Sequence, residues 1–182
     1  MAILRKPWVG SEYSSQKHKI LFVGESHYSV NYLEDSQKNE DLTIACVKQY
    51  CNDEWKNRTW GILVAQFCKI FGTERYARRD FFEKISYMNY IQHCMQYPGE
   101  SPFKYFIHNN DYQTHFYNVL SEIKPSVVIL FSQRIAELWD YKECGIANTL
   151  KESGIQYFPI GHLSRMKQDG KIKIDAIITK LQ

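Results

Sequence analysis

The stretch KILFVGESHYS, residues 19 to 29, combines the features that decide the fold. Its first half, Ile20 to Val23, is an uninterrupted apolar run, a pattern typical of a strand buried on both faces of a parallel sheet. The run ends at Gly24, and Glu25 to Tyr28 follow at once with side chains that can exchange protons or form hydrogen bonds. The stretch therefore predicts a core strand that delivers polar side chains to the edge of a sheet.

Three more apolar segments have the composition of buried strands, and amphipathic segments separate them. These strand segments are ISYMNYI (Ile85–Ile91), SVVILF (Ser126–Phe131) and IQYFPI (Ile155–Ile160). Helical spacing predicts helices near Asp41, Trp60–Phe71, Tyr112–Ile123, Gln133–Asp140, Ala147–Ser153 and Ile172–Leu181. Buried strands that alternate with helices indicate an α/β protein. We expect a three-layer α/β/α sandwich around a central, mainly parallel four-stranded sheet.

Composition places the chain among ordinary globular proteins. It has 182 residues, of which 44% are hydrophobic and 24% charged, and we expect a single domain over residues 1–182. No apolar stretch approaches the roughly 20 residues that span a bilayer, and the first ten residues lack a signal-peptide core. We therefore expect a cytoplasmic protein without a membrane partner, most simply a monomer.

The net charge of +3 is too small for a general polycation, so binding to nucleic acid would require a local basic surface. The aromatic content of 15% leaves rings available for stacking as well as for the core. The five cysteines are scattered without a CxxC pair. This spacing favours free structural thiols over a metal or iron–sulfur site.

Ligands of parallel sheets sit at the carboxyl ends of the strands. This rule places Gly24–Tyr28, Asn89, Ser132 and His162 along one rim of the expected sheet. Each segment taken alone has a simpler interpretation, since Ser26 and Ser164 could cap helices and Asn89 could be a turn residue. Their position at the ends of several strands of one sheet favours a site.

Three of these segments resemble the motifs of the uracil-DNA glycosylase superfamily. The counterparts are GESHY at Gly24–Tyr28, YMNYI at Tyr87–Ile91 and GHLSR at Gly161–Arg165, and Glu122–Trp139 resembles the family's Pro–strand–helix segment. The order and approximate spacing are kept over nearly the whole chain. The resemblance implies the fold of that superfamily and hydrolysis of the N-glycosidic bond of uracil or another damaged base in DNA.

The chain departs from the family pattern at several positions. His27 and Leu163 stand where relatives usually carry Pro, and Ser26 stands where many carry Asp or Asn. Glu25 matches a branch with Glu directly after the Gly. That branch usually holds an iron–sulfur cluster on four cysteines, but here Cys94 alone falls close to a ligand position. We therefore expect no cofactor and no metal.

The resemblance implies a role for each matching residue. Glu25 would stabilise the oxocarbenium-like sugar and orient water, and His162 would stabilise the departing base. Asn89 would recognise the Watson–Crick edge of the flipped base, and Tyr28 would exclude a thymine methyl. The ring that stacks on the base is left open among Phe67, Trp60 and Tyr32.

The segment after the last expected strand would contact DNA. Leu163 or Met166 would fill the gap in the base stack, Arg165 and Lys167 would bind phosphates, and Ser164 matches the Ser of the family motif. A solvated charged turn is the simpler alternative for Arg165 and Lys167.

Two other functions fit the same residues. The chain could be a non-catalytic or repurposed member of the fold that binds a nucleobase, nucleic acid or protein. It could also be a hydrolase that uses Ser26 or Ser164 with a histidine, which ranks last because the chain has no GxSxG motif.

Overall fold

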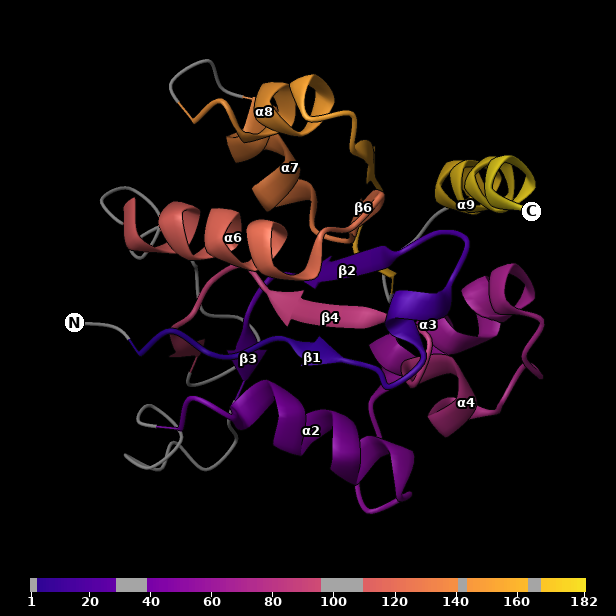
Figure 1. The fold of residues 1–182 in the computed structure, drawn as a ribbon. Helices are drawn as coiled ribbons and strands as arrows, with labels where there is room; N and C mark the ends of the chain where they lie inside the picture. The colour runs from indigo at the N-terminus through magenta and orange to yellow at the C-terminus, as the bar shows by residue number, and fades with distance from the viewer. Residues whose placement is uncertain (1–2, 29–38, 96–109, 141–143, 164–167) are drawn as a thin grey trace.

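The central feature of the computed structural model is a five-stranded sheet in the order β1-β4-β2-β6-β7 (Figure 1). The structure describes residues 3–28, 39–95, 110–140, 144–163 and 168–182. The strands are β1 (Trp8–Val9), β2 (Ile20–Gly24), β4 (Ser86–Asn89), β6 (Val127–Leu130) and β7 (Gln156–Pro159). β4, β2, β6 and β7 pair in parallel, and β1 pairs antiparallel with β4.

The α/β class expected from the sequence is confirmed, but the expected sheet was incomplete. The sheet is mixed and has five strands, because the N-terminal segment adds β1 next to β4. β1 is only two residues long, so it leaves no periodic pattern in the sequence. A second small sheet pairs β3 (His27–Tyr28) in parallel with β5 (Cys94–Met95), and it was not expected either.

Helices lie on both faces of the large sheet (Figure 1). They are α2 (Leu42–Cys51), α3 (Arg58–Phe67), α4 (Arg78–Phe82), α6 (Asn110–Ile123), α7 (Gln133–Asp140), α8 (Ile146–Glu152) and α9 (Gln168–Leu181), with short 3-10 turns η1 (Tyr13–Ser15) and η2 (Cys68–Phe71). Five of the six expected helical regions are present with shifted ends, and the sixth, α7, has the expected bounds. The five-residue α4 was missed because it is too short to show a period.

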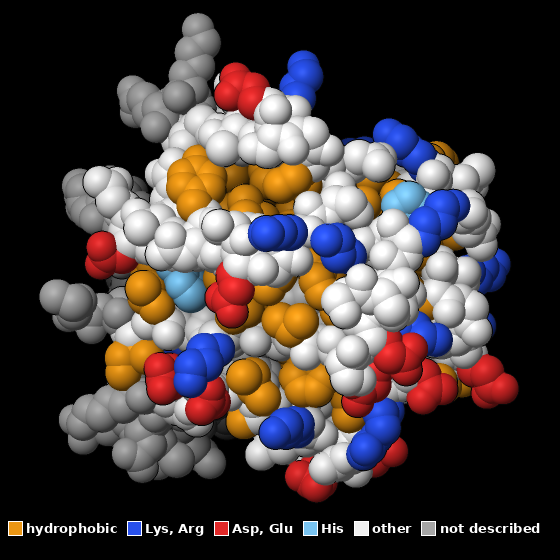
Figure 2. Space-filling model, viewed as in Figure 1, with side chains coloured by type: hydrophobic (Ala, Val, Ile, Leu, Met, Phe, Trp, Pro, Cys, Tyr) orange, Lys and Arg blue, Asp and Glu red, His pale blue; other side chains and the backbone are white. Residues whose placement is uncertain are grey.

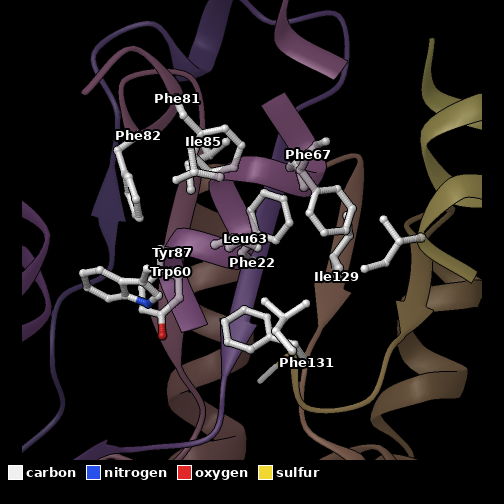
Figure 3. Close-up of a cluster of buried hydrophobic side chains, with 14 of the residues drawn as sticks. Phe22, Trp60, Leu63, Phe67, Phe81, Phe82, Ile85, Tyr87, Ile129 and Phe131 are labelled. Carbon is white, nitrogen blue, oxygen red and sulfur yellow. The ribbon is translucent and has the colours of Figure 1, made fainter. Parts of the chain in front are cut away.

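Alternating side chains of β2 supply two separate cores, one on each face of the sheet. Ile20 and Phe22 pack with residues of α2, α3, α4 and α9. Leu21 and Val23 pack with residues of α6, α7 and α8. Figure 3 shows the first of these clusters, where Phe67 of α3 and Phe81 of α4 pack against Phe22. Because every residue of β2 is buried, its carboxyl end is held rigidly between the two layers.

The surface of the described residues carries both signs of charge. On the face in Figure 2, Lys and Arg side chains are interspersed with Asp and Glu side chains. Among the described residues, no helix combines the length and the apolar character needed to cross a membrane.

Candidate functional site

A small pocket lies at the carboxyl ends of the parallel strands. It has a volume of about 90 Å³, enough for several water molecules but well below the ~300 Å³ of clefts for drug-sized ligands. Its lining residues come from four strand ends and from the start of α3: Glu25, Ser26, Asn57, Thr59, Trp60, Tyr87, Asn89, Phe131 and His162. We call this the strand-end pocket. It suits a small group on the scale of a single ring.

The first wall is built by the pairing of β2 with β4. Gly24 lies directly opposite Asn89 in the register of the two strands. The Asn89 side-chain oxygen accepts a hydrogen bond of 3.0 Å from the Tyr87 hydroxyl. A Cβ on Gly24 would lie 2.3 Å from that oxygen and 2.6 Å from the Tyr87 hydroxyl. Glycine is therefore required here for close approach, and burial raises the pKa of Tyr87 so that its hydroxyl remains a donor.

Glu25 is held by two residues of the turn between β6 and α7. The Ser132 hydroxyl donates to Glu25 Oε2 at 2.7 Å. Arg134 donates from Nη2 to Oε1 at 2.5 Å and from Nε to Oε2 at 3.2 Å, which makes a two-point ion pair. Glu25 is 8% exposed, so its carboxylate has a fixed position at the pocket.

Aromatic rings form the apolar side of the pocket. The Trp60 and Tyr87 rings lie edge to face with centroids 5.0 Å apart, and the Phe131 ring lies 6.0 Å from Tyr87. Asn57 caps α3 by accepting a 3.1 Å hydrogen bond from the Trp60 backbone N–H, which fixes the start of the helix beside the pocket. The pocket thus has a polar rim and a rigid aromatic wall.

The neighbouring residues Ser26 and His27 behave differently from each other. The Ser26 hydroxyl is buried and has no hydrogen-bond partner among the described residues, although Ser26 lines the pocket. His27 lies outside the pocket and its Nε2 forms a 2.9 Å hydrogen bond with the Thr43 hydroxyl. Burial, with a smaller effect of the Arg5 charge, lowers the pKa of His27 to about 3. His27 is therefore a neutral structural residue at physiological pH.

The residues predicted from the sequence fall into three groups. Glu25, Asn89 and His162 line one pocket, and so does Trp60. The backbone of Tyr28 forms β3, but its side chain lies outside the described part of the structure, as do Tyr32, Ser164, Arg165, Met166 and Lys167. Two predicted residues lie elsewhere.

Phe67 and Leu163 are both in the hydrophobic core and not at the pocket. Phe67 packs edge to face against Phe22 with ring centroids 5.2 Å apart (Figure 3), so of the three rings left open for stacking on a base, Phe67 does not line the pocket. Leu163 is 2% exposed and packs in the same cluster, so its side chain is not presented as a wedge for DNA. Both are apolar residues whose burial already stabilises the fold.

Sequence reasoning missed several residues of the site. Tyr87 and Phe131 lie within quoted motifs but were assigned only to strands, and Arg134 was placed on a helix without a role. Ser132 was placed on the rim, which is where its hydroxyl meets Glu25. The available signal was the polar sequence SQR directly after a buried strand, the same pattern that singled out Glu25.

No cluster of metal-ligating side chains stands out in the described residues. No group of three or more His, Cys, Asp or Glu side chains there is arranged to hold a metal ion. All five cysteines are free thiols. Comparison of the chain with protein-family models, with curated proteins and with solved structures gives no match.

Proposed function

We propose that this protein is a DNA glycosylase that hydrolyses the N-glycosidic bond of uracil or another damaged base. The observation that carries the proposal is the common location of Glu25, Asn89 and His162. Glu25 follows β2, Asn89 is the last residue of β4 and His162 lies after β7, and all three line one pocket. An acid, an amide and a histidine at one pocket with aromatic walls are the groups that this reaction requires.

In the proposed reaction, the C1′–N bond breaks with its electron pair going to the base. The Glu25 carboxylate lies on the sugar side, stabilises the positive charge on the sugar and directs a water oxygen to C1′. His162 donates a hydrogen bond to the oxygen of the departing base, which carries the negative charge. The water proton ends on the base, so the products are an abasic sugar and a neutral free base.

The Asn89 amide supports a preference for a base with a carbonyl at the recognised position. Because its oxygen accepts from the Tyr87 hydroxyl, the amide nitrogen is turned away from that bond and has no partner among the described residues. An N–H donor matches a carbonyl oxygen such as O4 of uracil and opposes the amino group of cytosine. The small volume of the pocket supports a one-ring base.

The architecture supports the proposal at a coarser level. Four parallel strands bring the resembling motifs to one edge of the sheet, as a uracil-DNA glycosylase-like fold requires. The partner under this proposal is DNA, and no step of the chemistry is assigned to a metal or cofactor.

The test is release of the base from a labelled oligonucleotide. Purified protein is incubated with single- and double-stranded substrates carrying uracil, hypoxanthine or xanthine, and abasic sites are cleaved with alkali. We expect cleavage with at least one base, loss of cleavage in Glu25→Gln and His162→Ala, and normal cleavage in Arg79→Gln, which changes an exposed residue of α4 away from the pocket. No cleavage of any substrate by the wild-type protein would contradict the proposal.

One observation favours a second candidate, a protein that binds a base without cleaving the bond. Arg134 and Ser132 together use at least three of the roughly four acceptor positions of the Glu25 carboxylate. The positive charge of Arg134 also offsets the negative charge that would stabilise the sugar cation. Tight binding of free uracil by wild-type protein, together with no cleavage, would favour this candidate.

A further inference from the structure

Arg134 occupies a position that no part of the proposed reaction has yet used. It is the second residue of α7, and its side chain is 40% exposed where it meets the almost fully buried Glu25. Only one edge of the guanidinium, Nε and Nη2, faces the carboxylate. A guanidinium has five N–H donors, so the Nη1 side remains available. Among the described residues, no hydrogen bond to this Nη1 side is present.

The turn that carries Arg134 is fixed by Ser132. The Ser132 hydroxyl oxygen accepts from the Ile135 backbone N–H at 3.3 Å, which caps α7, and the same hydroxyl donates to Glu25. The Ala136 N–H also bonds to the Ser132 carbonyl oxygen at 3.0 Å. Arg134 therefore projects from a helix start that is tied to the carboxylate it binds.

Under the proposed function, the position of Arg134 beside Glu25 puts it close to the phosphate backbone of the bound DNA strand. If Glu25 faces the anomeric carbon of a flipped nucleotide, the phosphates of that nucleotide are only a few bonds away. A partly exposed guanidinium with unused donors matches the geometry of a phosphate oxygen pair. We propose that Arg134 orients Glu25 with one edge of its guanidinium and binds a backbone phosphate of the substrate strand with the other. This inference rests on the proposed function.

The dual contact resolves the charge problem at Glu25. In the free protein the ion pair is nearly neutral and stabilises a sugar cation weakly. A phosphate bound to Arg134 offsets the positive charge of the guanidinium, so the Glu25 carboxylate acts more strongly on the sugar. The DNA strand that supplies the base then also activates the Glu25 carboxylate. A free nucleoside lacks the phosphate and is therefore a poor substrate.

The experiment separates the two contacts with two substitutions of one residue. Arg134→Gln removes both the two-point hold on Glu25 and the phosphate charge. Arg134→Lys keeps a point charge for the phosphate but loses the planar fork that orients the carboxylate. Ser132→Ala weakens the hold on Glu25 and leaves Arg134 in place. Arg79→Gln, which removes an exposed Arg of α4, is the control for the loss of one positive charge.

The first measurement is the salt dependence of binding to an oligonucleotide that carries a tetrahydrofuran abasic analogue. Fluorescence anisotropy between about 50 and 200 mM salt gives the slope of log K against log salt. We expect the slope to fall by about 1 in Arg134→Gln and to stay at the wild-type value in Arg134→Lys, Ser132→Ala and Arg79→Gln. An unchanged slope in Arg134→Gln overturns the phosphate contact.

The second measurement is kcat for base release at saturating oligonucleotide. We expect a fall of about 10-fold to 100-fold in both Arg134 variants and a smaller fall in Ser132→Ala, because each leaves the general-base carboxylate less well placed. Wild-type kcat in Arg134→Lys overturns the positioning role. If wild-type protein cleaves nothing while the Arg134→Gln slope still falls, the proposed function fails and the phosphate contact stands. If cleavage is normal in all variants and no slope changes, the inference fails and the proposed function stands.

Discussion

Glu25 and His27 are two residues apart in the sequence, but they lie in opposite kinds of environment. Glu25 lines a pocket and forms an ion pair with a partly exposed arginine. His27 is closed off against Thr43 and is neutral because burial lowers its pKa. The difference shows that an ionisable side chain at a strand end does not by itself make a functional site. The side chain also needs access to a ligand and a partner that stabilises its charge.

The largest expected effect is on catalytic activity, and it tests the contrast between Glu25 and His27. Glu25→Gln keeps the size of the side chain but removes the charge, and we expect base release to fall between ~100-fold and ~10,000-fold. His27→Gln changes a residue outside the pocket and should leave kcat within about 3-fold of wild type. Single-turnover cleavage of a uracil oligonucleotide measures both. Equal losses in the two variants would remove the distinction between them.

Next in size is the effect of a methyl group on the wall of the pocket. In Gly24→Ala the new Cβ would clash with the Asn89 side-chain oxygen and the Tyr87 hydroxyl. We expect the free energy of unfolding to fall by about 3 kcal/mol. Gly61→Ala is the matched control, since its nearest contact would be 3.7 Å away and helix propensity favours Ala by about 1 kcal/mol. Urea denaturation of both variants measures the difference. A tolerated Gly24→Ala would mean that the pairing at this strand end is loose.

The pH dependence of stability tests the enclosed environment of His27. Its pKa is about 3 in the folded protein and near 6.5 in the unfolded chain, so below pH 6.5 only the unfolded chain takes up the proton. The stability that depends on neutral His27 is therefore present above pH 6.5 and is lost as the pH falls toward 3. Between pH 7 and pH 5 this costs about 2 kcal/mol.

Denaturant titrations of wild type and His27→Gln at both pH values isolate this contribution. The other titrating groups are the same in both proteins, so the difference between their pH slopes belongs to His27. Parallel slopes would show that the pKa of His27 is the same in the folded and unfolded protein, and that water reaches its side chain in the folded protein.

The smallest effect concerns the hydrogen bond that orients Asn89. Tyr87→Phe removes the hydroxyl that donates to the Asn89 oxygen, and we expect a loss of about 1 kcal/mol in stability. The same change frees the amide to turn, so binding of uracil should weaken relative to binding of cytosine. Calorimetric titration with the free bases measures this, and Tyr76→Phe, on an exposed tyrosine, should change neither quantity.

Much of the fold could be predicted because its main strands are local patterns. The apolar runs around Phe22 and Ile129 identify buried strands without knowledge of their partners. β1 and α4 could not be found in this way, because they are too short to carry a period and are held by pairing and packing with distant parts of the chain.

Residues of the candidate site could be predicted only where a general rule relates position in the sequence to position in the fold. The carboxyl ends of parallel strands identified Glu25, Asn89 and His162. The contact of Arg134 with Glu25 depends on side-chain conformations of two segments more than a hundred residues apart, which no local pattern encodes. Phe67 and Leu163 were misplaced because a buried ring or leucine and one that lines a pocket look the same in sequence.

The turn from Phe131 to Arg134 has a consequence for protein engineering. Within four consecutive residues it supplies a wall ring, the cap of α7 and three hydrogen bonds to Glu25. Substitutions at these positions should be strongly non-additive, because each one changes the context in which the others act. A library that varies these residues singly would misjudge their effects, whereas a library that varies them together with Glu25 would sample the combinations that keep their interactions.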